Sequence, residues 1–528
     1  MSSLVSSLVS TSATHIKSPL CLLAEKAATR LFQLISSGTL IIHTPGHTYY
    51  FGEDDSSDAL VAELTVRNPN FWVRLCAMGD LGFSEAYMYG EIDCEDLVKV
   101  FRVFLANRSQ LSSIDNSLFS RLAGSLPDVG LTARIVNTVT NARKNISAHY
   151  DISNAMFMGF LSKDMTYSCA IFPELDSDLR QPNSSSSRHA SPHRSTSSTP
   201  SLTGASTPST LADLDAHERD LPKDLQLGAL GLLSAADGAF RRIRTLVSDV
   251  EDPLEAAQYR KLHHIIRKAD IRPGHRVLEI GSGWGSMSLL ITSTIPGTTV
   301  DTLTLSTQQA ELARKRAADA GLSDRITVHL MDYRNMPPAW EGAFDRLVSV
   351  EMVEAVGREY METYWEKIDW ALNKETGVGV VQGITIPEAR FEQYVREVDF
   401  IRKWVFFPGG FLPTLSFMVE TLTKGSQGRL VVDSVSNIGP HYARTLREWR
   451  RRFEAHFEDI IIPALKAEYP GVMDSDDAKA QAEIEVFRRK WIYYYCYCEV
   501  GFTTRRLGDH IIAFSREGNV EYGCQVYA

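Results

Sequence analysis

Residues 277–286, Val-Leu-Glu-Ile-Gly-Ser-Gly-Trp-Gly-Ser, join a short apolar run to three glycines spaced two residues apart. The apolar run predicts a buried strand, and the apolar residues 287–295 that follow predict a helix. Glycine at 281, 283 and 285 lets the backbone approach a ligand where a Cβ atom would collide. The stretch therefore predicts a strand, a ligand-binding turn and a helix; a glycine-rich turn without a ligand is the alternative.

Two phosphate-binding motifs are excluded by the same residues. The dinucleotide motif GxGxxG requires glycine where the chain has Ser286, and a P-loop requires Gly-Lys followed by Ser or Thr. The stretch instead resembles the ExGxGxG loop of S-adenosylmethionine (SAM)-dependent methyltransferases. In that loop the acid, here Glu279, orients the turn, and the glycines line the methionine and ribose parts of SAM. The resemblance places four further residues at the SAM site: Gly281, Gly283, Trp284 and Gly285.

Short apolar runs alternate with helical stretches after residue 270, which predicts a mostly parallel sheet with crossover helices, an α/β fold. The expected strands are 277–280, 299–305, 326–330, 346–350 and 378–384. Nearer the N-terminus, alternation predicts strands at 40–50 and 62–66, and apolar spacing predicts helices at 71–77 and 84–89. These elements predict a small additional α+β domain.

The chain of 528 residues is long enough for two folded units. We expect a flexible tail over 1–20, a small domain over 21–125 and a larger domain over 126–528. Residues 181–210 contain eleven Ser, five Thr and four Pro, which predicts a disordered insertion over 176–215. Residues 225–246 have the spacing of an amphipathic helix, which either packs on the body or touches lipid.

Charge and cysteine content narrow the function classes. A net charge of −10 argues against nucleic acid as a partner. The seven cysteines lack the paired CxxC spacing of zinc sites, so no metal is expected and a reducing, cytoplasmic location fits best. The chain lacks a membrane-spanning apolar run, so any contact with lipid is expected at the membrane surface. One basic cluster predicts either a solvated helix face or a lipid head-group site: Arg444, Arg447, Arg450, Arg451 and Arg452.

Polar residues that follow the expected second and third strands are candidates for cofactor contacts. Asp301 lies about twenty residues past the first glycine, where a ribose-binding acid is often found. Side chains alternate along a strand, so Asp301 and Thr304 do not readily face the same ligand. Asp332 and Tyr333 follow the third strand, where a carboxylate could accept the adenine amino group and a ring could lie beside the base; a solvent-facing loop acid is the alternative.

Several separate segments, considered together, resemble cyclopropane fatty acid synthases and the mycolic acid cyclopropane synthases. The likeness spans residues 79–514 apart from the Ser-rich insertion. The segments are His149-Tyr150-Asp151-Ile152-Ser153-Asn154, Met165-Thr166-Tyr167-Ser168-Cys169-Ala170-Ile171-Phe172, 278–285, Leu303-Thr304-Leu305-Ser306 with Gln309, Asp332-Tyr333-Arg334, Glu351-Met352-Val353-Glu354-Ala355-Val356-Gly357, Phe407-Pro408-Gly409-Gly410 with Leu412-Pro413, and His441-Tyr442.

This resemblance implies a class I, Rossmann-like SAM-dependent methyltransferase fold. In that family a cis alkene of a lipid acyl chain attacks the SAM methyl group, and the resulting carbocation loses a proton as a three-membered ring closes. The site must align a weak nucleophile and exclude water, and aromatic faces can stabilise the cation. An unsaturated phospholipid or fatty acyl chain is the implied substrate, with peripheral membrane contact; a homodimer is left open. The resemblance implies seven SAM contacts: Tyr167, Ser168, Gly281, Gly283, Thr304, Gln309 and Tyr333.

The family is understood to hold a bicarbonate ion as general base. The implied holders are Cys169 and Ile384 through their backbones, with Glu354, Gln382 and Tyr442. Gln382 departs from the family, which often has histidine there, and glutamine donates a hydrogen bond but carries no charge. Structural roles remain alternatives for Glu354 and Tyr442, as a capping carboxylate and a core phenol.

Three further expectations follow from the resemblance. Cys498 matches a cysteine once assigned to catalysis, although a buried packing role is favoured. Residues 79–107 resemble the N-terminal domain of the longer synthases, which would present membrane or substrate; structural support is the alternative. Two other functions stay open, namely a lipid methyltransferase that leaves a methyl branch on a fatty acyl chain or sphingoid base, and a catalytically idle lipid- or SAM-binding protein.

Overall fold

The computed structural model describes residues 18–52, 60–115, 153–180, 250–405 and 410–523. The Ser-rich stretch 181–210, the expected amphipathic helix at 225–246 and the family segments at 149–152 and 407–409 lie outside the described residues. We expected the disordered insertion to begin at residue 176, but the structure describes residues 176–180. Asp178 in this segment forms an ion pair with Arg447. The described chain therefore continues past the boundary that composition indicated.

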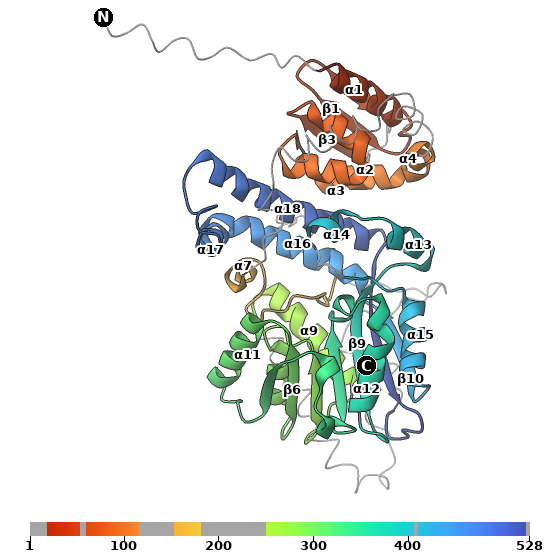
Figure 1. The fold of residues 1–528 in the computed structure, drawn as a ribbon, viewed down its shortest axis with the longest axis vertical. Coiled ribbons are helices and arrows are strands. Elements are labelled where there is room, and N and C mark those ends of the chain that lie inside the picture. The colour runs from red at the N-terminus through yellow and green to blue at the C-terminus, as the bar shows by residue number, and fades with distance from the viewer. Residues whose placement is uncertain (1–17, 53–59, 116–152, 181–249, 406–409, 524–528) are drawn as a thin grey trace, which may run out of the picture.

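The N-terminal domain is the α+β unit expected from the sequence (Figure 1). Its sheet has the order β2-β1-β3-β4. The expected helices 71–77 and 84–89 are the two halves of α2, which breaks at Gly79, where φ is 54°. The elements are α1 (Pro19–Phe32), β1 (Thr39–His43), β2 (Thr48–Phe51), β3 (Val61–Val66), α2 (Asn70–Met88), β4 (Ile92–Asp93), α3 (Leu97–Ala106) and α4 (Arg108–Asp115).

The larger domain is built on a seven-stranded sheet of order β10-β11-β9-β8-β5-β6-β7. The five strands expected from the sequence are parallel, as predicted. Two antiparallel strands, β10 and β11, were not expected; β11 returns beside β9 at the end of the chain. The strands are β5 (Arg276–Ile280), β6 (Thr299–Thr304), β7 (Ile326–Leu330), β8 (Arg346–Val350), β9 (Val378–Thr385), β10 (Leu430–Asn437) and β11 (Gly508–Arg516).

Helices cover both faces of this sheet because alternate strand residues point to opposite sides. Val277 packs in the core that contains residues of α9 and α10, whereas Leu278 packs in the core lined by α12 and α15. The helices of this domain are α7 (Asn154–Met158), α9 (Pro253–Lys268), α10 (Ser286–Thr294), α11 (Thr307–Asp319), α12 (Met361–Ala371), α13 (Glu388–Arg396), α14 (Phe400–Trp404), α15 (Leu415–Gly425), α16 (Gly439–Ala455), α17 (Ile462–Glu468) and α18 (Ala478–Thr503).

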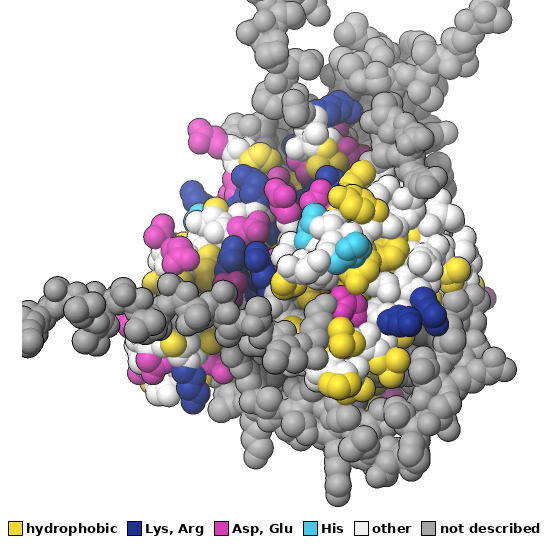
Figure 2. Space-filling model, turned by 90° about the horizontal axis from the view of Figure 1, so that it is seen from above, with side chains coloured by type: hydrophobic (Ala, Val, Ile, Leu, Met, Phe, Trp, Pro, Cys, Tyr) yellow, Lys and Arg dark blue, Asp and Glu magenta, His cyan; other side chains and the backbone are white. Residues whose placement is uncertain are grey.

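The helices α16 and α18 lie side by side between the sheet domain and the N-terminal domain (Figure 1). Arg489 on α18 joins the two domains through Asp93, with Nη1 3.0 Å from Oδ1. Lys403 on α14 pairs with the buried Glu85 of α2 at 2.6 Å. Seen from the N-terminal end, the surface mixes acidic and basic side chains, with hydrophobic ones beside them (Figure 2). Within the described ranges, no helix combines the length and apolarity needed to cross a bilayer.

The basic cluster on α16 is neither a solvated face nor an available head-group site, so both interpretations were wrong. Arg447 is paired with Asp178, and Arg452 with Asp252 at 2.9 Å. Their side chains are only 11% and 16% exposed. Four of the arginines instead tie α16 to neighbouring segments, whereas Arg451 pairs with Glu448 of the same helix and remains largely exposed.

Candidate functional site

The glycine loop at the end of β5 has the backbone of a ligand cradle. Gly281, Gly283 and Gly285 have φ values of 98°, 47° and 88°, a region that favours glycine. A Cβ atom added to Gly283 would meet nothing within 4 Å, so open space lies beside the loop. At Gly281 the added atom would lie 3.0 Å from Cβ of Met352, which follows β8. The loop therefore fits SAM and touches the segment that carries the acids described below.

Side-chain hydrogen bonds anchor this loop. Glu279 is buried in β5 and accepts a hydrogen bond from Ser288 on α10, which agrees with an orienting role. Burial raises the pKa of Glu279 to about 7. Trp284 donates through Nε1 to Oδ1 of Asn154 at 2.8 Å. The strand β5, the helix α10 and the first residue of α7 thus hold the turn in one shape.

The candidates on β6 separate as the alternation indicated. Thr304 ends the strand, and its hydroxyl lies 2.8 Å from Oε1 of Gln309. Asp301 lies earlier on the same strand and contacts two other side chains. Its Oδ2 is 2.9 Å from Nη2 of Arg276, and its Oδ1 is 2.8 Å from Nε2 of His329. Thr304 on β6 and Gln309 on α11 therefore remain the SAM candidates in this region.

Asp332 and Tyr333 follow β7, the next strand of the same edge. Asp332 caps a short helical turn and pairs with Arg334 at 2.6 Å. The ring of Tyr333 makes an edge contact with Tyr364, with the centroids 5.5 Å apart. The parallel strands β5, β6 and β7 therefore bring the proposed SAM residues to one edge, while contact with adenine stays a prediction.

A carboxylate that the sequence did not single out lies at the end of β8. Glu351 is half-buried and accepts three hydrogen bonds from distant parts of the chain. The backbone N–H of Cys169 and the side-chain amide of Gln382 both donate to Oε1, each at 2.8 Å. The hydroxyl of Tyr442 donates to Oε2 at 2.6 Å. Glu351 therefore lies at the centre of the expected anion site.

Two more acids surround Glu351. Glu354 accepts a hydrogen bond from the backbone N–H of Ile384 at 2.5 Å, and its Oε2 is buried without a hydrogen bond in the described structure. Burial and the charge of Glu351 raise the pKa of Glu354 to about 8. Asp509 on β11 accepts from Gln382 at 2.8 Å, and burial and the charge of Glu351 raise its pKa strongly. The cluster therefore keeps Glu354 and Asp509 mostly protonated near neutral pH.

The five expected bicarbonate holders do come together, but bicarbonate does not fit among them as they stand. The donors of Cys169, Gln382 and Tyr442 are engaged by Glu351, and the N–H of Ile384 is engaged by Glu354. Sequence reasoning named residues that lie together in the structure, but it did not single out Glu351 among them. The available signal was the position of this acid directly after a parallel strand, where α/β sites form.

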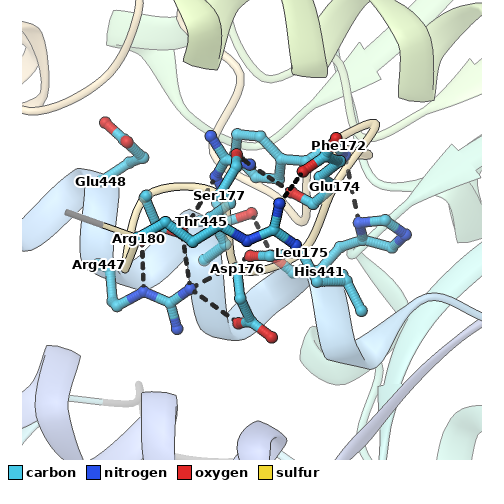
Figure 3. A network of polar contacts seen from close by, with 12 residues as sticks. Phe172, Glu174, Leu175, Asp176, Ser177, Arg180, His441, Thr445, Arg447 and Glu448 are labelled. Carbon is cyan, nitrogen blue, oxygen red and sulfur yellow. Dashed lines mark hydrogen bonds and ion pairs between the residues drawn. The ribbon is translucent and has the colours of Figure 1, made fainter. Parts of the chain in front are cut away.

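The segment 167–178 is fastened to α16, which sets the position of the Cys169 amide (Figure 3). The backbone N–H of Phe172 donates to Nδ1 of His441 at 3.2 Å, and that of Ala170 donates to the hydroxyl of Thr445 at 3.1 Å. Arg447 binds Asp178 at 2.7 Å. On the α9 side, Lys261 donates to the hydroxyl of Ser168 at 2.5 Å.

Aromatic rings line this region. The ring of Tyr167 stacks on Trp449 with the centroids 4.9 Å apart, and its hydroxyl lies 3.0 Å from that of Tyr494. The ring of Tyr442 lies 4.5 Å from that of Phe502. These faces form an apolar, electron-rich wall beside the acid cluster.

The thiols of the site are poor nucleophiles. Burial raises the pKa values of Cys169 and Cys498 far above the ordinary range. A buried protonated thiol reacts weakly. This agrees with a packing role for Cys498, and it leaves the backbone N–H of Cys169 as the group that contacts the acid cluster.

The sheet order, with β11 inserted antiparallel, and the glycine loop after β5 are those of a class I SAM-dependent methyltransferase. The family model for mycolic acid cyclopropane synthetase matches residues 137–191 and 245–510, more than half of the chain, and the chain belongs to this family.

Three known proteins are similar to the chain. It is 30% identical to the tuberculostearic acid methyltransferase UfaA1 of Mycobacterium tuberculosis over 88% of this chain and 85% of that protein. It is 27% identical to the cyclopropane-fatty-acyl-phospholipid synthase of Escherichia coli over 88% and 90%. The solved structure of the mycolic acid cyclopropane synthase CmaA1 with SAH and CTAB is 21% identical, covers 70% of this chain and 97% of that one, and has a TM-score of 0.46.

Proposed function

We propose that the protein transfers the methyl carbon of SAM to a cis double bond of an unsaturated lipid acyl chain and forms a cyclopropane ring. The observation that carries this proposal is the acid cluster of half-buried Glu351 with buried Glu354 and Asp509, which adjoins the glycine loop through Met352. A methyl transfer to oxygen or nitrogen has no need of such a dry acid site beside aromatic walls. An alkene does, because its cation must lose a proton and must avoid water.

SAM supplies an electrophilic methyl group when bound. The residues proposed to hold it are those at the ends of β5, β6 and β7, together with Tyr167 and Ser168. Aromatic faces of Tyr167, Tyr442 and Trp449 would stabilise positive charge on the acyl chain. An ionised carboxylate of the acid cluster would accept the proton that the cation loses, and the enclosing side chains would keep water out.

A methyl-branched product is the second candidate, and the identity to UfaA1, named as a methyltransferase, favours it. Both products share the first bond-forming step. Ring formation and methylation with retention of an alkene each add one CH2, so mass alone does not separate them. Cyclopropane protons resonate upfield of ordinary methylenes, and proton NMR of the extracted lipid distinguishes the two products.

Contact with a membrane surface is part of the proposal. The acyl chain must leave a bilayer or a carrier to reach the site. The helix α1 exposes Leu22 and Leu23 at 53% and 48%. Such apolar side chains can insert at a lipid surface.

Release of S-adenosylhomocysteine from purified protein tests the function. We expect release with vesicles of unsaturated phospholipid and SAM, and none with saturated vesicles of the same head group. Release that is equal on both lipids would contradict the alkene as acceptor. Binding of SAM without release on any unsaturated lipid would favour the idle SAM-binding protein instead.

A further inference from the structure

The Glu351 carboxylate occupies the position that a free anion would need. A bicarbonate ion and a carboxylate each present two oxygens on a planar carbon, so the same donors suit both. Here the Cys169 amide, the Gln382 amide and the Tyr442 hydroxyl all point at Glu351. A second anion in contact with this carboxylate would be strongly repelled in a buried site.

We propose that Glu351 is the built-in general base of this enzyme and takes the place of a bound bicarbonate. This inference rests on the proposed function, because it needs a cation that loses a proton. It adds what that function leaves open, namely which group receives the proton.

The backbone at Glu351 supports a required side chain. Its φ is 48°, a left-handed value that residues other than glycine seldom adopt. Such strain persists where the surrounding structure holds it, and it is common at functional sites. Glycine would be the favoured residue here on conformational grounds alone. The chain instead has a glutamate whose carboxylate accepts hydrogen bonds from Cys169, Gln382 and Tyr442.

The charges around Glu351 agree with an ionised base. The Cys169 N–H and the Nε2–H2 group of Gln382 can only donate, so Oε1 of Glu351 accepts both hydrogen bonds. Asp509 and Glu354 face it from β11 and from the turn after β8, and Lys261 faces it from α9. Burial raises the pKa of Glu351, while the Cys169 hydrogen bond, Lys261 and the Tyr442 hydrogen bond oppose the rise. A raised pKa strengthens a carboxylate as a base.

The proposed reaction needs no reactant besides the alkene, SAM and the Glu351 carboxylate. The alkene π electrons form the new C–C bond to the methyl carbon as the S–CH3 bond breaks, which leaves S-adenosylhomocysteine and a carbocation. A C–H bond of the transferred methyl group then gives its proton to a Glu351 oxygen. The electron pair of that C–H bond closes the ring, or forms a double bond in the branched product. The proton later returns to solvent.

Two variants of Glu351 distinguish a reaction in which Glu351 accepts the proton from one in which a bound bicarbonate accepts it. Glu351→Gln keeps the size and the acceptor oxygen but takes up no proton, so we expect turnover to fall by about 10²- to 10⁴-fold, the usual worth of a general base. Glu351→Gly removes the side chain and leaves the donors of Cys169, Gln382 and Tyr442 for a small anion. Its activity should be low in carbonate-free buffer and should rise at least about tenfold with added bicarbonate.

The matched control is Gln427→Gly. Gln427 has a φ of 54° and is exposed on the surface, so its replacement relieves similar strain away from the site. We expect wild-type turnover from this variant, with no response to bicarbonate. Wild-type protein should also be indifferent to removal of bicarbonate.

A binding measurement keeps the inference testable without turnover. Carbon-13 NMR of labelled bicarbonate should show line broadening with Glu351→Gly and none with the wild type or Gln427→Gly. Bicarbonate binding by the wild type, or wild-type activity that is lost in carbonate-free buffer, overturns the inference and leaves the proposed function standing. Wild-type protein that releases no S-adenosylhomocysteine overturns the proposed function, and Glu351 then has no proton to accept.

Discussion

The hydroxyl of Tyr442 on α16 lies 2.6 Å from Oε2 of Glu351 at the end of β8, across 91 residues of sequence. This hydrogen bond joins the helical layer to the carboxyl edge of the sheet. It stabilises the ionised form of Glu351 and lowers its pKa. The bond therefore links the packing of α16 to the chemistry of the site.

Replacement of Tyr442 by Phe should shift the pH dependence of turnover. The loss of the donor raises the pKa of Glu351, and a base acts only when deprotonated, so the acidic limb of the kcat profile should move to higher pH. The profile of S-adenosylhomocysteine release against pH measures this shift. Tyr50→Phe, at an exposed position, serves as the control. An unmoved limb with an intact fold would remove Tyr442 from this role.

Glu354→Gln should lower turnover while SAM affinity stays within about threefold of the wild type. The carboxyl of Glu354 is hydrogen-bonded to Ile384 N–H on the acid side of the site, whereas the glycine loop binds SAM. We expect a loss of about 10²-fold in kcat, in the range for one proton-handling group. Calorimetry of SAM binding and steady-state kinetics provide the two readouts, with the exposed Glu359→Gln as control. A large loss of SAM affinity would contradict this assignment.

Glu279→Gln should change how stability depends on pH. The folded pKa of Glu279 is about 7, above the ordinary value of 4.5, because burial disfavours the charge. Its contribution to stability is complete below pH 4.5 and is lost as the pH rises towards 7. The variant should therefore gain stability relative to the wild type across this window, by about 3 kcal/mol at most.

Urea denaturation of the two proteins at several pH values checks this expectation. Glu311→Gln, at an exposed position on α11, should leave the difference from the wild type independent of pH. A constant difference for Glu279→Gln as well would show that Glu279 is not ionising within that range.

Arg74→Met should unfold the N-terminal domain at lower denaturant concentration. Arg74 is buried in α2 and pairs with Glu85 at 2.9 Å and Glu91 at 3.0 Å. Removal of the cation leaves both carboxylates buried near the remaining charge of Lys403, at a cost of about 3–5 kcal/mol. Arg67→Met, which breaks the exposed pair with Asp93, should cost about 1 kcal/mol or less. Equal losses in the two variants would contradict the importance of burial.

Much of the sheet domain could be predicted because its signals are local. Apolar runs of strand length alternate with helical spacing, and the five parallel strands lie where those runs occur. The glycine loop is also local, since its φ values depend on the absence of a Cβ atom at Gly281, Gly283 and Gly285. The strands β10 and β11 were missed because an antiparallel return depends on a partner far away in the sequence.

The arginines of α16 show the limit of reasoning from local charge. Five basic residues within nine positions predict an exposed surface, but Arg447 and Arg452 meet acids that lie 269 and 200 residues away. Burial with a partner removes the exposure that the sequence pattern suggested. Pairing at this distance is decided by packing.

By itself the sequence determined a doubly wound sheet, a SAM-type turn after residue 280 and the residues that gather around an anion. Tertiary structure alone decided which anion they gather around. Glu351 receives its donors from Cys169, Gln382 and Tyr442, which are 182, 31 and 91 residues away. Such hydrogen bonds form only when packing of a strand end, its neighbouring strand and a covering helix brings donor and acceptor atoms within 3 Å of each other. No local sequence pattern encodes this long-range packing.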